Sequence, residues 1–267
     1  MKAPASSKLI AGCYQFRVHP GQVKKNLRLV EMALSWFADQ GCQLLILPEM
    51  WSCGFFYDDL RGMAKETPAV LNDLQNWSRQ HGLVLVGSLP ELVGDVVCNT
   101  AYVVDSDGEI VGSYRKIHLF SVTQEHRYFT RGSQPLVCQT QAGRLGVMTC
   151  YDLRFPELAR RLALNGADLL CYGALWPAVR VDHWALLLRA RALENQLFVL
   201  GCNGCGTEGK TIYGGRSALV SPAGVELAEA DDQESRLLAT LDMNEMDEFR
   251  RQIPCFQDRS PGIYQIL

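Results

Sequence analysis

Three residues of reactive type stand at the ends of apolar runs in this sequence. Glu49 closes the run LLILPE, Lys116 lies in GSYRKIHLF, and Cys150 closes LGVMTC. A sulfur nucleophile needs a base that takes its proton, and a buried amine can stabilise negative charge that develops on an attacked carbonyl. Because ligands of α/β proteins gather at the carboxyl ends of strands, we predict that these three groups meet in one pocket.

Each residue, taken alone, also fits a purely structural interpretation. Glu49 fits a solvated loop carboxylate just past a strand, and Lys116 fits a surface lysine on an edge strand. Cys150 fits one more buried thiol among the ten cysteines of the chain. The prediction of a catalytic site therefore depends on the three residues acting together.

The surroundings of Cys150 favour the chemical interpretation. The apolar strand stops at this cysteine, and Pro156 begins a helix a few residues later. A tight strand-to-helix turn exposes the side chain at the turn and directs backbone N–H groups into the same space. The nearby charged residues Asp152, Arg154 and Glu157 also need a reason to stand beside a core thiol.

The elements that must position these residues alternate between strand and helix. Apolar runs predict strands over 8–16, 44–49, 83–89, 167–173 and 197–203, and helical spacing predicts helices over 21–40, 156–166 and 180–196. Thr67-Pro68 predicts another helix start, and Ser106-Asp107-Gly108 predicts a hairpin. A strand, a helix and a buried strand with a polar end recur in both halves, as LLILPE and LGVMTCYD. We therefore expect residues 1–267 to form one α/β domain of two similar halves, with mixed sheets and helices outside.

Composition narrows the possible partners and cofactors. The 267 residues carry a formal net charge of -3, which argues against nucleic acid as the main partner. The ten scattered cysteines fit reduced core thiols in the cytoplasm, and the start MKAPASSKLIAG resembles no secretory leader. No apolar run approaches membrane-spanning length, so no membrane association is expected.

The lone CxxC pair, Cys202 and Cys205, is a weak zinc pattern, and the five dispersed histidines form no ligand pair. We expect neither a metal nor an organic cofactor.

Three segments, LPEMW, YRKIHLF and CYDLRFPE, resemble in this order the signature segments of the nitrilase superfamily of carbon–nitrogen hydrolases. The resemblance extends through HWALLLRARALENQ and GGRSALVSPAG, nearly the whole chain. It implies a four-layer αββα sandwich and a catalytic triad. By motif, Glu49 would be the general base, Lys116 the oxyanion stabiliser and Cys150 the nucleophile. The backbone N–H of Tyr151 would assist Lys116, and Glu125 in TQEHRYF matches a further glutamate of the family that would orient the substrate or the base.

CYDLRFPE and LPEMWSCGF most resemble the omega-amidase branch of that superfamily. The resemblance implies hydrolysis of the terminal amide of small dicarboxylic monoamides such as 2-oxoglutaramate or succinamate. Nitrile hydrolysers usually carry Trp after the cysteine, where this chain has Tyr151, which disfavours a nitrile substrate. Arg154 is the candidate for binding the distal carboxylate, and an ion pair with Asp152 or Glu157 is its alternative.

Other functions stay open at this point. Within the superfamily, they are a hydrolase of N-carbamoyl or ureido acids and a hydrolase of deaminated glutathione. A catalytically silent binding subunit belongs to another class, and the intact trio of reactive residues argues against it. The family also implies a homodimer or a larger homo-oligomer. Whether the polar loop 120–135 acts as a lid is left open.

Overall fold

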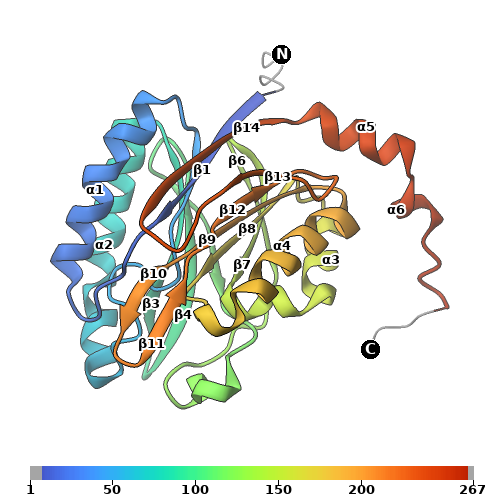
Figure 1. Ribbon diagram of the computed structural model, residues 1–267. Helices are drawn as coiled ribbons and strands as arrows, with labels where there is room; N and C mark the ends of the chain where they lie inside the picture. Colours follow the sequence, from blue (N-terminus) through green and yellow to red (C-terminus); the bar gives the residue numbers. More distant parts are fainter. Residues whose placement is uncertain (1–7, 264–267) are drawn as a thin grey trace.

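Two six-stranded mixed sheets form the centre of the molecule in the computed structural model, which describes residues 8–263 (Figure 1). The first sheet has the spatial order β14 (Ser235–Asp242), β1 (Lys8–Gln15), β2 (Leu44–Ile46), β3 (Val84–Val93), β4 (Val96–Val104), β5 (Ile110–Arg115). The second has the order β13 (Glu226–Glu229), β12 (Ala218–Val220), β9 (Phe198–Asn203), β8 (Leu169–Ala174), β7 (Gly143–Thr149), β6 (Leu136–Thr140). A separate hairpin joins β10 (Cys205–Glu208) and β11 (Thr211–Gly214).

Helices cover the outer faces of both sheets, which gives the four layers αββα (Figure 1). The first sheet is covered by α1 (Val23–Asp39) and α2 (Leu60–His81), and the second by α3 (Pro156–Leu164) and α4 (Val181–Asn195). The short helices α5 (Asn244–Gln252) and α6 (Cys255–Asp258) follow β14. None of the helices within residues 8–263 is long and apolar enough to span a bilayer. The predicted sandwich is confirmed.

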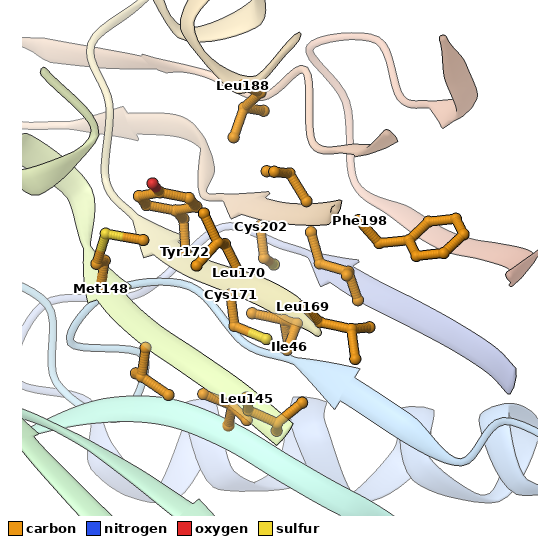
Figure 2. Close-up of a cluster of buried hydrophobic side chains, with 14 of the residues drawn as sticks. Ile46, Leu145, Met148, Leu169, Leu170, Cys171, Tyr172, Leu188, Phe198 and Cys202 are labelled. Atoms are coloured by element: carbon orange, nitrogen blue, oxygen red, sulfur yellow. The ribbon is translucent and has the colours of Figure 1, made fainter. Parts of the chain in front are cut away.

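Strand β2 illustrates why the central strands are apolar on both faces. Leu44 and Ile46 belong to the cluster that fills the space between the sheets, whereas Leu45 and Leu47 pack in the cluster under α1 and α2. Alternate residues of a strand point to opposite faces, so a strand between two covered faces needs a continuous apolar run. Figure 2 shows Ile46 among residues of the second sheet, including Leu145 and Cys171.

The two sheets repeat one pairing pattern. In each, three adjacent parallel strands (β1, β2, β3 and β7, β8, β9) are flanked by antiparallel neighbours. The topology therefore has the two similar halves that the sequence suggested. The sequence suggested that LLILPE and LGVMTCYD are equivalent segments of the two halves, but they are not. Strand β2, from LLILPE, is the middle strand of its parallel triplet and so corresponds to β8, whereas β7, from LGVMTCYD, is the first strand of its triplet and corresponds to β1.

One expectation about local structure was wrong, and one hairpin was not predicted. Helix α2 begins at Leu60, not at Thr67, because the carboxylate of Asp59 caps it by accepting the N–H of Gly62 at 3.0 Å. Pro68 lies inside the helix, and the Thr67 hydroxyl donates to the Pro90 carbonyl at 2.5 Å instead of capping. The hairpin of β10 and β11 was not expected, since its short strands carry no clear apolar alternation.

The second sheet packs tightly against the segment that leads to Glu49. Gly173, near the end of β8, leaves no room for a side chain, since a Cβ there would lie 2.7 Å from the carbonyl oxygen of Leu47. The nearest other atoms would be the carbonyl carbon of Pro48 and the backbone nitrogen of Glu49. This glycine therefore sets how near the second sheet stands to the segment that carries Glu49.

Replacing Gly173 by Ala should lower the free energy of unfolding by about 1–3 kcal/mol, because backbone on both sides must move to admit the methyl group. Urea denaturation measures the effect. The matched control is Gly262→Ala, where the new Cβ meets nothing within 4 Å and stability should be unchanged. A Gly173→Ala protein as stable as wild type would show that the sheets can separate here at no cost.

Candidate active site

The three sequence-predicted residues come from the carboxyl ends of three strands. Glu49 follows β2 by three residues, Lys116 comes directly after β5, and Cys150 comes directly after β7. All three line one cavity of about 630 Å³, and Glu125 from the 120–135 loop lines it too. This volume suits a small-molecule ligand.

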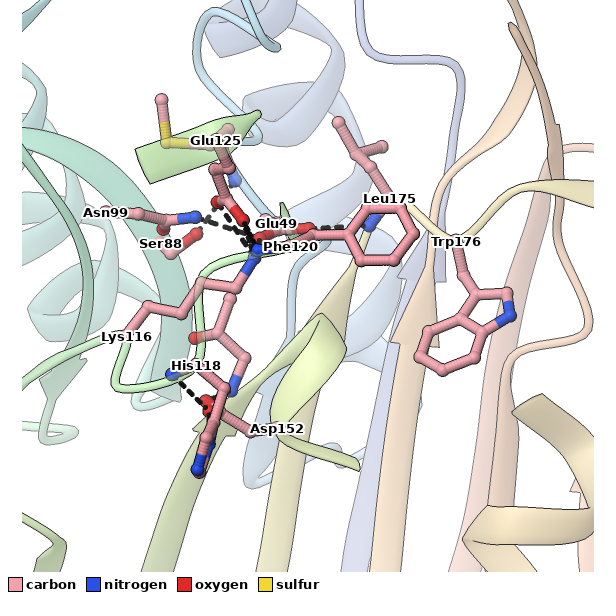
Figure 3. A network of polar contacts seen from close by, with 12 residues as sticks. Glu49, Ser88, Asn99, Lys116, His118, Phe120, Glu125, Asp152, Leu175 and Trp176 are labelled. Atoms are coloured by element: carbon pink, nitrogen blue, oxygen red, sulfur yellow. Dashed lines mark hydrogen bonds and ion pairs between the residues drawn. The ribbon is translucent and has the colours of Figure 1, made fainter. Parts of the chain in front are cut away.

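A buried ammonium lies at the centre of the site (Figure 3). Nζ of Lys116 lies 2.8 Å from Oε1 of Glu49 and 2.9 and 3.0 Å from the two carboxylate oxygens of Glu125. All three side chains are almost completely buried. Glu125 thus contacts Lys116, whereas the sequence analysis expected it to contact the substrate or Glu49. An ammonium has three N–H donors, so one of them can face the cavity while the other two bind the carboxylates.

Glu49 is fixed by groups from both sheets. Its Oε1 accepts the side-chain amide of Asn99 at 2.8 Å, and its Oε2 accepts the backbone N–H of Leu175 at 3.1 Å. Asn99 lies on β4, and its carbonyl also accepts the N–H of Lys116 at 2.8 Å. One asparagine therefore sets the position of the acid and of the amine together.

Cys150 occupies a strained turn between β7 and the short 3-10 helix η4 (Cys150–Arg154). Its φ is +47°, a left-handed conformation that non-glycine residues seldom adopt and that clusters at functional sites. The thiol lines the same cavity as the Glu49 carboxylate, and each of the two groups shifts the pKa of the other. The N–H of Tyr151 belongs to the first turn of η4, where helical N–H groups have no partner within the helix.

Asp152 connects the cysteine turn to the lysine segment. Its Oδ2 accepts the Tyr114 hydroxyl at 2.8 Å and the backbone N–H of Thr149 at 2.9 Å. Its Oδ1 lies 2.7 Å from Nδ1 of His118 and accepts the His118 N–H at 3.1 Å. The His118 ring also stacks on Phe155, with 3.6 Å between the ring centroids. His118 therefore has a structural role, and both oxygens of Asp152 are bound within the protein.

Burial and charge together set the protonation states of the site. Burial raises the pKa of Glu49 above its ordinary value; the charge of Lys116 opposes this shift and that of Glu125 adds to it. Burial acts to lower the pKa of Lys116, but Glu49 and Glu125 together hold it well above the ordinary value. Burial, and then Glu49, raise the pKa of the Cys150 thiol well above its ordinary value. The resting site therefore holds a neutral thiol beside a carboxylate of raised proton affinity.

Arg154 lines the cavity. The alternative prediction for this residue, an ion pair with Asp152 or Glu157, is wrong. Its guanidinium carbon lies 4.6 Å from the centre of the Trp176 ring, and Nη1 and Nη2 each lie 3.4 Å from Nδ1 of His183. Asp152 is occupied elsewhere and Glu157 is exposed at the start of α3. Within residues 8–263, no carboxylate lies within ion-pair distance of Arg154.

The remaining wall of the cavity comes from residues that were not predicted to belong to the site. The β10–β11 hairpin contributes Glu208 and Tyr213, whose hydroxyl donates to the Glu208 carboxylate at 2.8 Å. Segment 175–180 contributes Trp176, whose indole N–H donates to the Arg180 carbonyl at 2.8 Å. The position of 175–180 just after the strand β8 could have indicated this segment, whereas no local pattern marks Glu208 and Tyr213 as part of a site. In the described part of the chain, no group of three or more His, Cys, Asp or Glu could hold a metal ion.

Comparisons with known proteins give the class of the molecule. The sequence model of the family described as "Carbon-nitrogen hydrolase" matches residues 10–251. The 2-oxoglutaramate amidase of Bacillus subtilis (strain 168) is 34% identical over 96% of this chain and 100% of its own length. The chloroplastic omega-amidase of Arabidopsis thaliana is also 34% identical, over 100% of this chain and 76% of its own length.

Solved structures agree. A carbon–nitrogen hydrolase from Helicobacter pylori G27 superposes with a TM-score of 0.92 at 27% identity and covers 97% of both chains. A mutant of the amidase from Nesterenkonia sp. AN1 has a TM-score of 0.86 at 28% identity, covering 98% of each chain; it carries the acetamide moiety of fluoroacetamide covalently at its active-site cysteine. The present chain belongs to the carbon–nitrogen hydrolase family, within the nitrilase superfamily. In that family it is an amidase of the omega-amidase-like branch.

Asp152→Asn should lower the free energy of unfolding by about 1–3 kcal/mol. The new NH₂ group must replace an acceptor that now receives N–H and O–H donors, so at least one buried donor is left without a partner. Thermal or urea denaturation measures the loss. Glu157→Gln makes the same chemical change at an exposed carboxylate five residues away and should be neutral. Equal stability of the two variants would contradict the connecting role of Asp152.

Proposed function

We propose that this protein hydrolyses the terminal amide of small linear dicarboxylic monoamides, such as 2-oxoglutaramate or succinamate, and releases ammonia. The observation that carries the proposal is that Cys150, on a turn with φ of +47°, lines one cavity with Glu49 and with the ammonium of Lys116 that Glu49 binds at 2.8 Å. Relatives described as 2-oxoglutaramate amidase and omega-amidase support the substrate class. The arrangement suits acyl transfer, which needs a nucleophile, a base and an oxyanion partner.

In the first half of the proposed reaction, Cys150 attacks the amide carbonyl while Glu49 takes its proton. The raised pKa values of both groups favour this division of roles, because the thiol keeps its proton until attack and the carboxylate has the affinity to receive it. The carbonyl oxygen becomes an oxyanion, which the ammonium of Lys116 and the backbone N–H of Tyr151 stabilise. Protonated Glu49 then gives its proton to the leaving nitrogen, and ammonia departs.

In the second half, water hydrolyses the Cys150 thioester. Glu49 takes a proton from the water as it attacks the acyl carbon, the C–S bond breaks, and the proton passes to the departing sulfur. The site returns to a neutral thiol and an ionised carboxylate. Glu125 positions Lys116 throughout, since both of its oxygens bind the ammonium. No step requires a metal or an organic cofactor.

Arg154 is the proposed partner of the distal carboxylate of the substrate. It lines the same cavity as Cys150 and has no carboxylate partner of its own among the described residues. The flat face of Trp176 supports the guanidinium, which leaves the edge of its planar fork for a ligand.

We further propose that residues 1–267 form one domain that acts in the cytoplasm as a homodimer or larger homo-oligomer. Helix α4 buries Trp184 and Leu188 against its own sheet but exposes Leu186 and Leu193, with 65% and 51% of their surface accessible. These two exposed leucines, two helical turns apart on one side of α4, support contact with a second copy.

Cys150→Ala and Cys150→Ser should each lower ammonia release from succinamate or 2-oxoglutaramate by about 1,000-fold or more, because the nucleophile is lost. A coupled assay of ammonia over a panel of amides, with glutamine and ureidopropionate included, measures both the loss and the substrate class. Cys255→Ser is the matched control, since Cys255 is exposed and should be dispensable. Near wild-type rates in either Cys150 variant would end the proposal.

The kcat/KM of the wild-type enzyme should fall at low pH, with a midpoint above pH 4.5, the ordinary pKa of a glutamate. The ionised form of Glu49 is the base, and its raised pKa means that this form is lost at a higher pH than usual. Glu49→Gln should lower kcat/KM by about 100- to 10,000-fold and abolish this acid limb. An unchanged pH profile in an active Glu49→Gln enzyme would show that another group is the base.

A further inference from the structure

A second arginine lies beside Arg154 at the outer end of the cavity. Arg180, the last residue of the 3-10 helix η5 (Ala178–Arg180), is half-buried and lines the same wall. Its guanidinium carbon lies 5.9 Å from the centre of the Phe120 ring, so an aromatic face supports it, as Trp176 supports Arg154. Burial lowers the pKa of Arg154, and the positive charge of Arg180 acts in the same direction, so each guanidinium lies within the electrostatic field of the other.

Neither arginine has a negative partner in the part of the chain that the structure describes. All ion pairs there involve other cations, and the cavity carboxylates Glu49 and Glu125 are bound to Lys116. The third cavity carboxylate, Glu208, binds the Tyr213 hydroxyl on the hairpin. Two like charges held near one another without a counter-charge are unfavourable until an anion lies between them.

We infer that Arg180 and Arg154 together form an anchor for the α-keto carboxylate end of the substrate, which makes the enzyme selective for 2-oxo acid amides over amino acid amides. This inference rests on the proposed amidase function. A carboxylate beside a 2-oxo group presents several acceptor oxygens in one plane, which two planar guanidinium forks can share. An α-ammonium in place of the 2-oxo group would be repelled by both arginines, so glutamine should be a poor substrate.

The test compares matched substrates. Succinamate and butyramide differ by a carboxylate in place of a methyl group, and 2-oxoglutaramate and glutamine differ by a 2-oxo group in place of an α-ammonium. Wild type should prefer the first member of each pair. Arg180→Met should raise the KM for succinamate and 2-oxoglutaramate roughly 10- to 100-fold, the range of a lost charge-assisted hydrogen bond. The KM for butyramide and kcat for all substrates should change little.

Three further variants sharpen the result. Arg154→Met should act like Arg180→Met, and the double variant should raise the KM by less than the product of the two single effects, because both arginines bind one group. Arg180→Lys keeps the charge but loses the planar fork, so its KM for succinamate should lie between those of wild type and Arg180→Met. Arg131→Met removes an exposed arginine that does not line the cavity and should leave every KM unchanged.

The possible outcomes separate the anchor from the function beneath it. If wild type releases ammonia from none of the amides, the proposed function itself fails. Suppose instead that wild type hydrolyses succinamate. If Arg180→Met then raises the KM for succinamate and the KM for butyramide equally, or raises neither, the anchor role of the arginines is rejected and the proposed amidase function stands. Loss of butyramide turnover would reveal that Arg180→Met fails to fold. In that case Arg180→Lys is the deciding variant, and a KM for succinamate equal to that of wild type rejects the anchor role.

Discussion

The arrangement of the site depends on one buried ammonium between two buried carboxylates. Removing three charges from water is costly, and only close pairing with good geometry recovers the cost. The pairing of Lys116 with Glu49 and Glu125 joins the end of β2, the end of β5 and the 120–135 loop. Because an unpaired member would be strongly unfavourable, these three segments must take up their positions together. Burial, with a smaller contribution from the charge of Glu125, raises the pKa of Glu49 despite the opposing charge of Lys116, which suits a group that receives and returns a proton.

Backbone strain is concentrated around these residues. Of the five non-glycine residues with positive φ within 8–263, three adjoin or form the site: Met50 after Glu49, Gln124 before Glu125, and Cys150 itself. Such conformations cost about 1–3 kcal/mol each and persist only where surrounding contacts over-determine them. Those contacts are visible: the N–H of Met50 donates to the Ser88 hydroxyl at 2.8 Å, and Asp152 accepts the N–H of Thr149. The sandwich therefore supplies the stability that allows reactive side chains to leave regular structure at the required angle.

The predictable part of this molecule is the part that simple patterns encode. The apolar run of 44–49 predicted a strand buried on both faces, although β2 is only Leu44–Ile46. The position of Glu49, Lys116 and Cys150 at strand ends predicted one pocket, because parallel strands present their carboxyl ends on the same side. The residue types also suggested which chemistry each could perform.

The contacts that refine the site could not be predicted in this way. Asn99 lies within a strand that looks ordinary in sequence, and its importance arises only because its carbonyl and its amide face Lys116 and Glu49. Asp152 looked like a possible partner of Arg154, but Tyr114, His118 and the backbone N–H of Thr149 bind its carboxylate instead. Thr67-Pro68 looked like a helix start because this pair is common in the first turn of helices, but Asp59 caps the helix earlier in the chain. Each case is a tertiary contact that overrides a local pattern.

The cavity also has opposite electrostatic character at its two ends, and this can orient a substrate. The inner end holds two carboxylates against one ammonium, so it favours a neutral amide and disfavours a carboxylate. At the outer end, Arg154 and Arg180 lie on aromatic faces with no carboxylate of the described chain to neutralise them. A molecule with an amide at one end and a carboxylate at the other would therefore be bound in one direction only. Its amide would reach Cys150 because its carboxylate is attracted outward and repelled from within, so the charges that select the substrate also align it for attack.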